Sequence, residues 1–179
     1  MAQELVWLDL EMSGLDPKRH RIIEIATIIT DSELKVIAEG PDLVIHAHDK
    51  ILERMNDYVH EMHHRSGLLD EVRKSTISIE EAEAKTLEFL DEHLEAKYRP
   101  PLCGNSIGTD RRFLDAQMNS LERRLHYRVV DVSSIKELAM RWNPEIDAEM
   151  PPKMETHRAL DDIIESIEEL KFYREKLFK

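Results

Sequence analysis

The stretch Val6-Trp7-Leu8-Asp9-Leu10-Glu11-Met12 begins as an apolar, β-prone run of the kind found in the middle of a sheet. Asp9 and Glu11 interrupt it at positions i and i+2. On a strand this spacing sends both side chains to one face, roughly 7 Å apart along the chain. Two acids on a buried face repel each other and lose hydration, so a positive group should lie between them. Alternatively, Glu11 already lies in a loop and both carboxylates are solvated. This stretch alone leaves both interpretations open.

The residues that follow predict two further strands. Residues 13–17 form a turn-forming Ser-Gly-Leu-Asp-Pro cluster, and residues 22–29 are a strongly β-branched run. A turn at residues 31–33 leads into a third strand at residues 35–45, which Gly40-Pro41 punctuates. Because the connections are short, we expect the three strands to form an antiparallel meander.

Helical patterns dominate the rest of the chain. Residues 50–75 predict short, broken helices, and Ser78 with Glu81 forms a capping box that starts a longer one. We then expect a short buried strand at 102–105, a helix at 110–125, a strand at 128–132 and a helix capped by Ser133 or Ser134 that runs to about Trp142. A loop at 144–155 and a final helix, with apolar residues from Leu160 to Leu177 at helical spacing, complete the chain. This order predicts one α/β domain, residues 1–179, with a central mixed β-sheet flanked by helices.

Composition limits the function. The chain carries 37 acids against 25 bases, a net charge of −12, and it has no basic tract. This argues against binding long duplex through many phosphate contacts. No run of about 18 apolar residues is present, so we expect no membrane span. The N-terminus resembles no signal segment, and the single cysteine, Cys103, excludes an internal disulfide. We therefore expect a cytoplasmic protein.

At two further places, acids lie where the ligand-binding edge of the sheet is expected. Asp110 follows a buried strand and a Gly- and Ser-containing turn, at the start of a helix, although it could simply complement the helix dipole. His157 and Asp162 are five residues apart, which is about 500° of helix rotation, so they cannot share a helical face. They can converge if His157 lies in the preceding loop. The competing interpretation is a surface histidine beside two capping acids.

Four acids and a histidine are together the groups that a two-metal hydrolase requires. Mg²⁺ and Mn²⁺ prefer oxygen ligands, and carboxylates can hold two such ions about 3.5–4 Å apart. A nearby neutral histidine can take the proton from an attacking water at physiological pH. Bound cations would also relieve the repulsion between Asp9 and Glu11.

The motifs resemble a known family. Residues 9–11, 105–114 and 157–162 resemble the three exonuclease motifs of the DEDD superfamily, in the subgroup that has a histidine in the third motif. Residues 7–16, 66–68, 126–128 and 157–162 resemble the oligoribonuclease family in particular, and the resemblance covers essentially the whole chain in the same motif order.

The resemblance implies a ribonuclease H-like exonuclease fold and a 3′-to-5′ exoribonuclease that degrades very short RNAs, chiefly dinucleotides, to 5′-mononucleotides. It implies two divalent ions, Mg²⁺ or Mn²⁺. Their ligands would be Asp9, Glu11, Asp110 and Asp162, and His157 would be the general base. The nearest competing function is that of a DEDD exonuclease that trims longer RNA or DNA 3′ ends. A binding module without catalysis and a purely structural acidic protein are more distant possibilities.

The resemblance also implies substrate contacts. Leu15 resembles an apolar wedge between the two bases, and we expect Met12 to contact the substrate beside it. Tyr58 stands where the family usually has tryptophan, and His63, or His64 beside it, corresponds to a substrate-side histidine. The residues expected to cap the 5′ phosphate are Ser106, Arg128 and Ser133. Tyr127 resembles a tyrosine that the family contributes across a homodimer interface. A −12 surface suits a substrate with few phosphates.

Overall fold

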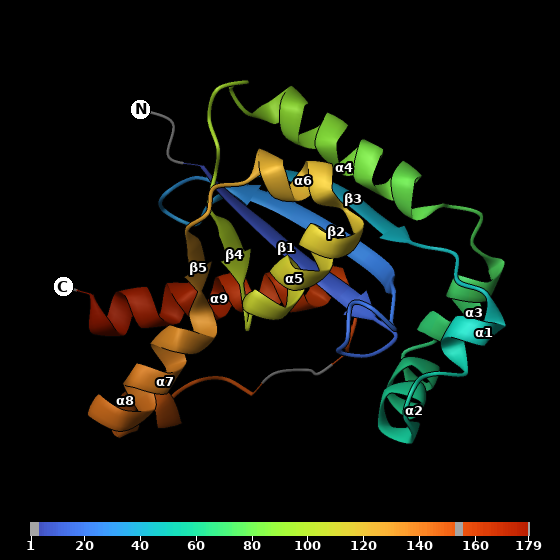
Figure 1. The fold of residues 1–179 in the computed structure, drawn as a ribbon. Helices are drawn as coiled ribbons and strands as arrows, with labels where there is room; N and C mark the ends of the chain where they lie inside the picture. Colours follow the sequence, from blue (N-terminus) through green and yellow to red (C-terminus); the bar gives the residue numbers. More distant parts are fainter. Residues whose placement is uncertain (1–3, 153–155, 179) are drawn as a thin grey trace.

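The computed structural model describes residues 4–152 and 156–178, which form a five-stranded sheet in the order β3-β2-β1-β4-β5 (Figure 1). The strands are β1 (Leu5–Met12), β2 (Ile22–Thr30), β3 (Val36–Val44), β4 (Leu102–Gly104) and β5 (Val129–Asp131). β1, β2 and β3 pair antiparallel, whereas β1, β4 and β5 pair parallel. The predicted N-terminal meander and the mixed sheet are both confirmed.

β1 has neighbours on both sides, and its pairing settles where Glu11 lies. Asp9 pairs with Ala26 and Glu11 with Glu24 across the antiparallel ladder. Glu11 is therefore a strand residue, and the interpretation in which it belongs to a solvated loop is wrong. β3 lies at the sheet edge, where a proline is tolerated because no further strand needs its missing N–H group. The ladder between β2 and β3 shifts register beside Gly40-Pro41.

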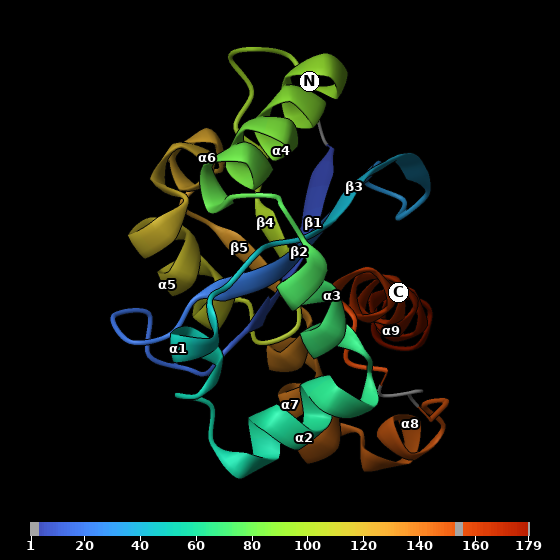
Figure 2. The same cartoon turned by 90° about the vertical axis from the view of Figure 1, so that its right-hand side faces the viewer.

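Helices cover both faces of the sheet. α4 (Ile79–His93), α5 (Gly108–Gln117) and α6 (Asn119–Arg124) lie on one side, and α9 (Ala159–Leu177) lies on the other (Figures 1 and 2). α7 (Val132–Trp142) and α8 (Pro144–Ala148) follow β5. The short helices α1 (Asp49–Leu52), α2 (Asp57–Arg65) and α3 (Leu68–Lys74) gather beyond the end of β1 (Figure 2). No helix of the described residues is both long and apolar enough to cross a membrane.

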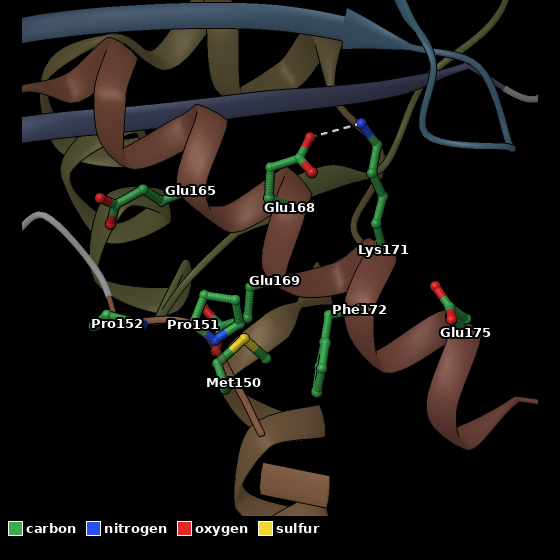
Figure 3. Close-up of a pocket in the computed structure, with 9 residues that line it drawn as sticks. All are labelled: Met150, Pro151, Pro152, Glu165, Glu168, Glu169, Lys171, Phe172 and Glu175. Atoms are coloured by element: carbon green, nitrogen blue, oxygen red, sulfur yellow. Dashed lines mark hydrogen bonds and ion pairs between the residues drawn. The ribbon is translucent and has the colours of Figure 1, made fainter. Parts of the chain in front are cut away.

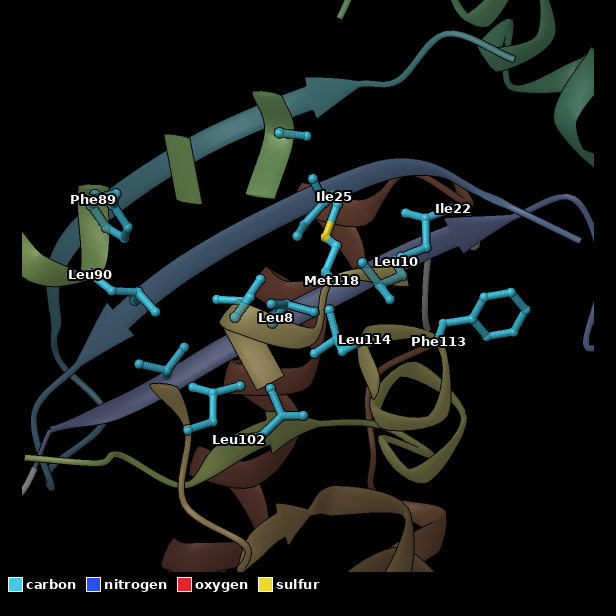
Figure 4. Packing of buried hydrophobic residues seen from close by; sticks show 14 of the residues in the cluster. Leu8, Leu10, Ile22, Ile25, Phe89, Leu90, Leu102, Phe113, Leu114 and Met118 are labelled. Carbon is cyan, nitrogen blue, oxygen red and sulfur yellow. The ribbon is translucent and has the colours of Figure 1, made fainter. Parts of the chain in front are cut away.

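The alternation of β1 divides its side chains between these two layers. Val6, Leu8 and Leu10 pack with α4, α5 and α6 in one hydrophobic cluster (Figure 4). Trp7 packs on the opposite face with Ala159, Ile163 and other residues of α9. Because side chains two residues apart on a strand share a face, Asp9 and Glu11 lie on the α9 side of the sheet.

Three helix predictions are wrong in detail. The helix expected at 110–125 is two helices, α5 and α6, because the backbone of Met118 leaves the helical conformation. The cap of α7 is Asp131, whose carboxylate accepts a hydrogen bond from the Ser133 amide, and not Ser133 or Ser134. An aspartate at the end of β5 can cap directly, so the helix starts one residue before Ser133. The loop expected at 144–155 contains α8, and its residues 153–155 lie outside the described residues.

Candidate active site

Three carboxylates meet on the α9 face of the sheet. Asp9 and Glu11 come from β1, and Asp162 comes from the first turn of α9. Each offers an oxygen within 4.8 Å of those of the other two, an arrangement that could hold a metal ion. Strand alternation brings the first two together, and the packing of α9 on the sheet brings the third.

Asp110 lies next to this group, in the first turn of α5. Its Oδ1 accepts a hydrogen bond of 3.1 Å from the Leu10 amide, so the carboxylate is tied to β1 between Asp9 and Glu11. Burial raises the pKa of Asp110 to about 7, although its backbone hydrogen bonds act in the opposite direction. Asp110 is not one of the three carboxylates whose oxygens lie within 4.8 Å of one another.

The protonation of the acids reflects how poorly this cluster tolerates negative charge. Burial, followed by the charges of Asp162, Glu24 and Asp110, raises the pKa of Glu11 to about 9 against the opposing effect of Arg158. Burial, followed by the charge of Asp110, likewise raises the pKa of Asp9. A bound divalent cation removes this penalty, and oxygen-only ligands suit Mg²⁺ or Mn²⁺. The donor set therefore fits such an ion.

His157 lies in the segment before α9, as the argument from helix rotation requires. α9 begins at Ala159, and the backbone of His157 has a positive φ of 52°. Its side chain lines a 480 Å³ pocket together with Met62, Arg65 and Asp161, among other residues. His157 therefore borders the space between α2 and the start of α9.

His63 of α2 contacts the acid cluster through Glu11. The fully buried ring approaches the Met12 carbonyl with Nε2 at 3.0 Å, and its Nδ1 lies 3.9 Å from Glu11 Oε2. Burial lowers the pKa of His63, which favours the neutral ring. The sequence left the choice between His63 and His64 open; the structure places His63 against the cluster and leaves His64 exposed.

A hollow of 710 Å³ adjoins Glu11 and Met12. Two exposed hydrophobic residues line it: Leu15, 69% exposed, follows β1, and Tyr58, 71% exposed, lies on α2. Arg19 and Arg54 also line the hollow, and sequence reasoning missed both. An isolated arginine carries no motif, so only the fold could bring these cations to one place.

The residues expected to cap the phosphate lie where β4 and β5 end. The Ser106 amide donates to Asp131 Oδ1 and to Ser133 Oγ, each at 3.0 Å, and the backbone of Ser106 has a positive φ of 51°. Arg128 Nε donates to the hydroxyl of Tyr127, which is 73% exposed. The structure thus brings Ser106 and Ser133 into contact, and places Arg128 and Tyr127 side by side.

A separate hollow of 570 Å³ lies against α9, beside Met150, Pro151 and Pro152 (Figure 3). Lys171 and Glu168 form an ion pair of 2.7 Å at its wall. None of the described residues that line this hollow is a sequence-predicted site residue, so it is distinct from the acid cluster.

The metal-free protein is expected to lose thermal stability as the pH rises from 7 to 9. A carboxyl whose pKa is raised in the folded state keeps its proton there after the unfolded chain has released it, so the free energy of unfolding falls as the pH rises from the unfolded pKa to the folded pKa. For Glu11 this interval runs from the ordinary value of 4.5 to about 9, so the loss continues through the window from pH 7 to 9. Asp42, with a pKa of about 6, and His63 titrate below this window. Melting temperatures in chelator at pH 7 and 9 test this, and a rise with pH contradicts it.

Comparisons with known proteins agree with this arrangement. The family model RNase_T, described as exonuclease, matches residues 6–170. An oligoribonuclease from Marinobacter nauticus is 55% identical over 178 residues, which cover 99% of this chain and 98% of that protein. An oligoribonuclease from Mycobacterium tuberculosis is 52% identical over 178 residues, which cover 99% of this chain and 83% of that protein.

Solved structures show the same fold at low sequence identity. Exonuclease I from Methylocaldum szegediense matches with a TM-score of 0.74 and 20% identity, over 99% of this chain and 42% of that one. The zinc-bound complex of Escherichia coli exonuclease I with single-stranded DNA matches with a TM-score of 0.76 and 15% identity, over 99% of this chain and 41% of that one. The chain thus spans about two fifths of these proteins.

Proposed function

Since this chain belongs to the oligoribonuclease family of exonucleases, we propose that it is a 3′-to-5′ exoribonuclease, folded as a single exonuclease domain over residues 1–179. Its substrates are very short oligoribonucleotides, chiefly dinucleotides, which it hydrolyses to 5′-mononucleotides. We also propose that it works in the cytoplasm, where the buried Cys103 thiol stays reduced.

The observation that carries this proposal is the group of three converging carboxylates, with Asp110 beside it. Asp9, Glu11, Asp162 and Asp110 would hold two divalent ions, Mg²⁺ or Mn²⁺. When bound, such ions supply a nucleophilic water at neutral pH and stabilise the oxygen that leaves phosphorus. The carboxylates would thereby fix where positive charge lies beside the scissile phosphate, at the end of β1.

His157 is the general base. His157 lines the pocket between α2 and the start of α9, and its imidazole would accept a proton from the attacking water. His63 has a different position, because Nε2 lies within hydrogen-bonding distance of the Met12 carbonyl. We assign His63 to the substrate side, where it orients the end of β1.

Leu15 and Tyr58 hold the bases. Leu15 packs between the two bases of a dinucleotide, and the Tyr58 ring stacks on one of them from α2. Stacking on an aromatic side chain is tolerant of base identity and contributes about 1–3 kcal/mol per base. Met12 completes the apolar wall, so the hollow accommodates bases of any sequence beside the acid cluster.

Ser106, Ser133 and Arg128 cap the 5′ phosphate and thereby limit substrate length. In support of this, the two serines are in contact at the ends of adjacent strands. The Arg128 guanidinium contacts the Tyr127 side chain and forms no ion pair with an acid of the described residues, so its charge can serve a phosphate. A substrate with one internal and one terminal phosphate needs few cations, which agrees with a net charge of −12.

A 5′-phosphorylated RNA dinucleotide is expected to turn over faster than a seven-nucleotide RNA when both are supplied with Mn²⁺. The Arg128→Ala variant should lose about 10–100-fold in kcat/KM for the dinucleotide, since a charge-assisted hydrogen bond contributes about 1.5–3 kcal/mol. Product chromatography over RNAs of two to ten nucleotides measures both. Equal rates at all lengths would instead support an exonuclease that trims longer RNA or DNA 3′ ends.

The protein is expected to be a homodimer in which each active site receives Tyr127 from the partner. Tyr127 is exposed, and so are the apolar side chains of Val129 and of Leu138, Met140 and Trp142 on α7. A second copy could cover this surface and place the ring near the substrate. Light scattering at micromolar concentration should report a dimer, and Tyr127→Ala should lower dinucleotide turnover. A fully active monomer contradicts this prediction.

A further inference from the structure

Glu24 is a buried acid that lies close to the carboxylates of the acid cluster. It lies in β2 opposite Glu11, and its side chain is 0% exposed. Directly opposed residues of an antiparallel pair project to the same face, so Glu24 adds negative charge beside carboxylates that already repel one another. A buried carboxylate is costly unless its oxygens are hydrogen-bonded.

Both oxygens of Glu24 are engaged at the start of α9. Oε1 accepts hydrogen bonds from Nε and Nη2 of Arg158, at 2.9 and 2.6 Å, and Oε2 accepts one of 3.0 Å from the Ala159 amide. Glu24 therefore faces α9 with its acceptors and is not among the carboxylates that converge at the metal site.

The bond to Ala159 caps α9 from the sheet. Arg158 is the N-cap residue, but its side chain makes no capping hydrogen bond. The first amides of a helix lack partners within the helix and favour a nearby anion, and here a strand residue supplies it. The carboxylate of Glu24 therefore fixes where the first turn of α9 begins on the sheet.

Arg158 extends this connection to α3. Its Nη1 and Nη2 donate to the two carboxylate oxygens of Glu71, at 3.0 and 2.8 Å. The Arg158 carbonyl accepts the backbone hydrogen bond of Asp162, at 3.0 Å, and His157 is its neighbour in the chain. One arginine thus joins the sheet, α3 and the segment that carries Asp162 and His157.

We propose that Glu24 and Arg158 are positioning residues that hold Asp162 and His157 in register with Asp9 and Glu11. The proposal rests on the proposed hydrolytic function for the role of His157. Its consequence for Asp162, however, concerns the metal site and can be measured without substrate.

Titration calorimetry with Mn²⁺ alone tests the metal-site consequence. Glu24→Gln is expected to weaken Mn²⁺ binding by about 10–100-fold, the usual cost of losing a group that orients a metal ligand. Glutamine replaces one of the two acceptor oxygens with an NH2 donor, so either Arg158 or the Ala159 amide then faces a donor in place of its acceptor. We also expect kcat for an RNA dinucleotide to fall with little change in KM.

Two further variants separate positioning from charge and from general destabilisation. Glu24→Asp keeps the charge but shortens the side chain, so it should weaken Mn²⁺ binding as Glu24→Gln does. Glu33→Gln is the matched control. It removes the ion pair with Arg174 near the other end of α9 and should leave Mn²⁺ binding unchanged. All measurements are made below the melting temperature of each metal-free variant.

If Glu24→Asp binds Mn²⁺ with wild-type affinity, the proposal is wrong. The negative charge of residue 24, and not the position of its carboxylate, would then account for its effect on Mn²⁺ binding. If neither Glu24 variant folds, the Arg158→Lys variant tests the proposal instead. The Arg158 side chain is partly exposed, and lysine keeps its charge without its bidentate geometry. Unchanged Mn²⁺ binding in Arg158→Lys also overturns it. Failure of the wild-type protein to hydrolyse RNA would count against the proposed function and leave the Mn²⁺ comparison valid.

Discussion

Replacing Glu11 with glutamine is expected to abolish hydrolysis while making the metal-free protein more stable. The neutral amide has nearly the shape of the carboxylate but carries none of the charge that burial and neighbouring acids oppose. With a folded-state pKa of about 9, Glu11 costs the metal-free protein on the order of a few kcal/mol at pH 7, since one pKa unit is about 1.4 kcal/mol. The melting temperature in chelator should rise by about 5 °C or more.

The same substitution should remove most of the stability that the metal confers. Glu11→Gln leaves the cluster with one anionic ligand fewer, so Mn²⁺ should raise the melting temperature less than it does in the wild-type protein. The loss of activity should exceed the about 10–100-fold cost of removing a group that only orients a ligand.

Melting curves with and without Mn²⁺, together with dinucleotide turnover, measure these effects. Glu39→Gln on β3 is a control in the same sheet and should change neither quantity. A Glu11→Gln variant that melts earlier than the wild-type protein in chelator would show that the carboxylate stabilises the fold, contrary to the expected repulsion.

Local patterns predicted the elements that place the acids. Strand alternation put Asp9 and Glu11 on one face, and helix geometry required His157 to lie outside the helix that carries Asp162. Both inferences concern residues at most five positions apart, so the local backbone geometry is sufficient to make them. The pairing of β1 with β2 and the start of α9 at Ala159 agree with them.

Contacts between distant segments were not predictable in this way. Glu24 lies in a β-branched run that indicates a buried strand, and an acid in such a run was a signal of the same kind as Asp9. Its partners, however, are 134 and 135 residues away, and no periodicity links them. Asp131 was missed as a cap for a different reason, because two serines shortly after it also fit a capping position.

The hollow beside Leu15 illustrates the same limit of local reasoning. Its walls come from the segment after β1 and from α2 with the residues just before it, which are short elements connected by polar residues. The sequence predicted broken helices there but not their position at the end of β1. At that position the buried His63 of α2 lies within hydrogen-bonding distance of the Met12 carbonyl, a contact that no local pattern indicates.

Replacing His157 with alanine is expected to lower kcat by about 10²–10⁴-fold, the usual contribution of a general base, while leaving metal binding intact. The imidazole is outside the group of converging carboxylates, so the Mn²⁺-induced rise in melting temperature should persist. Asp162→Asn should behave differently, because it removes a carboxylate of that group and should therefore lose both the rise and the activity.

The pH dependence of the His157→Ala variant separates a lost base from a displaced substrate. Without a base, hydroxide in solution must take its place, so the residual rate should keep rising with pH under saturating dinucleotide. His93→Ala, at the exposed end of α4, is the matched control and should retain wild-type kcat. If His157→Ala changes KM but not kcat, the imidazole binds substrate, and another group must take the proton from the attacking water.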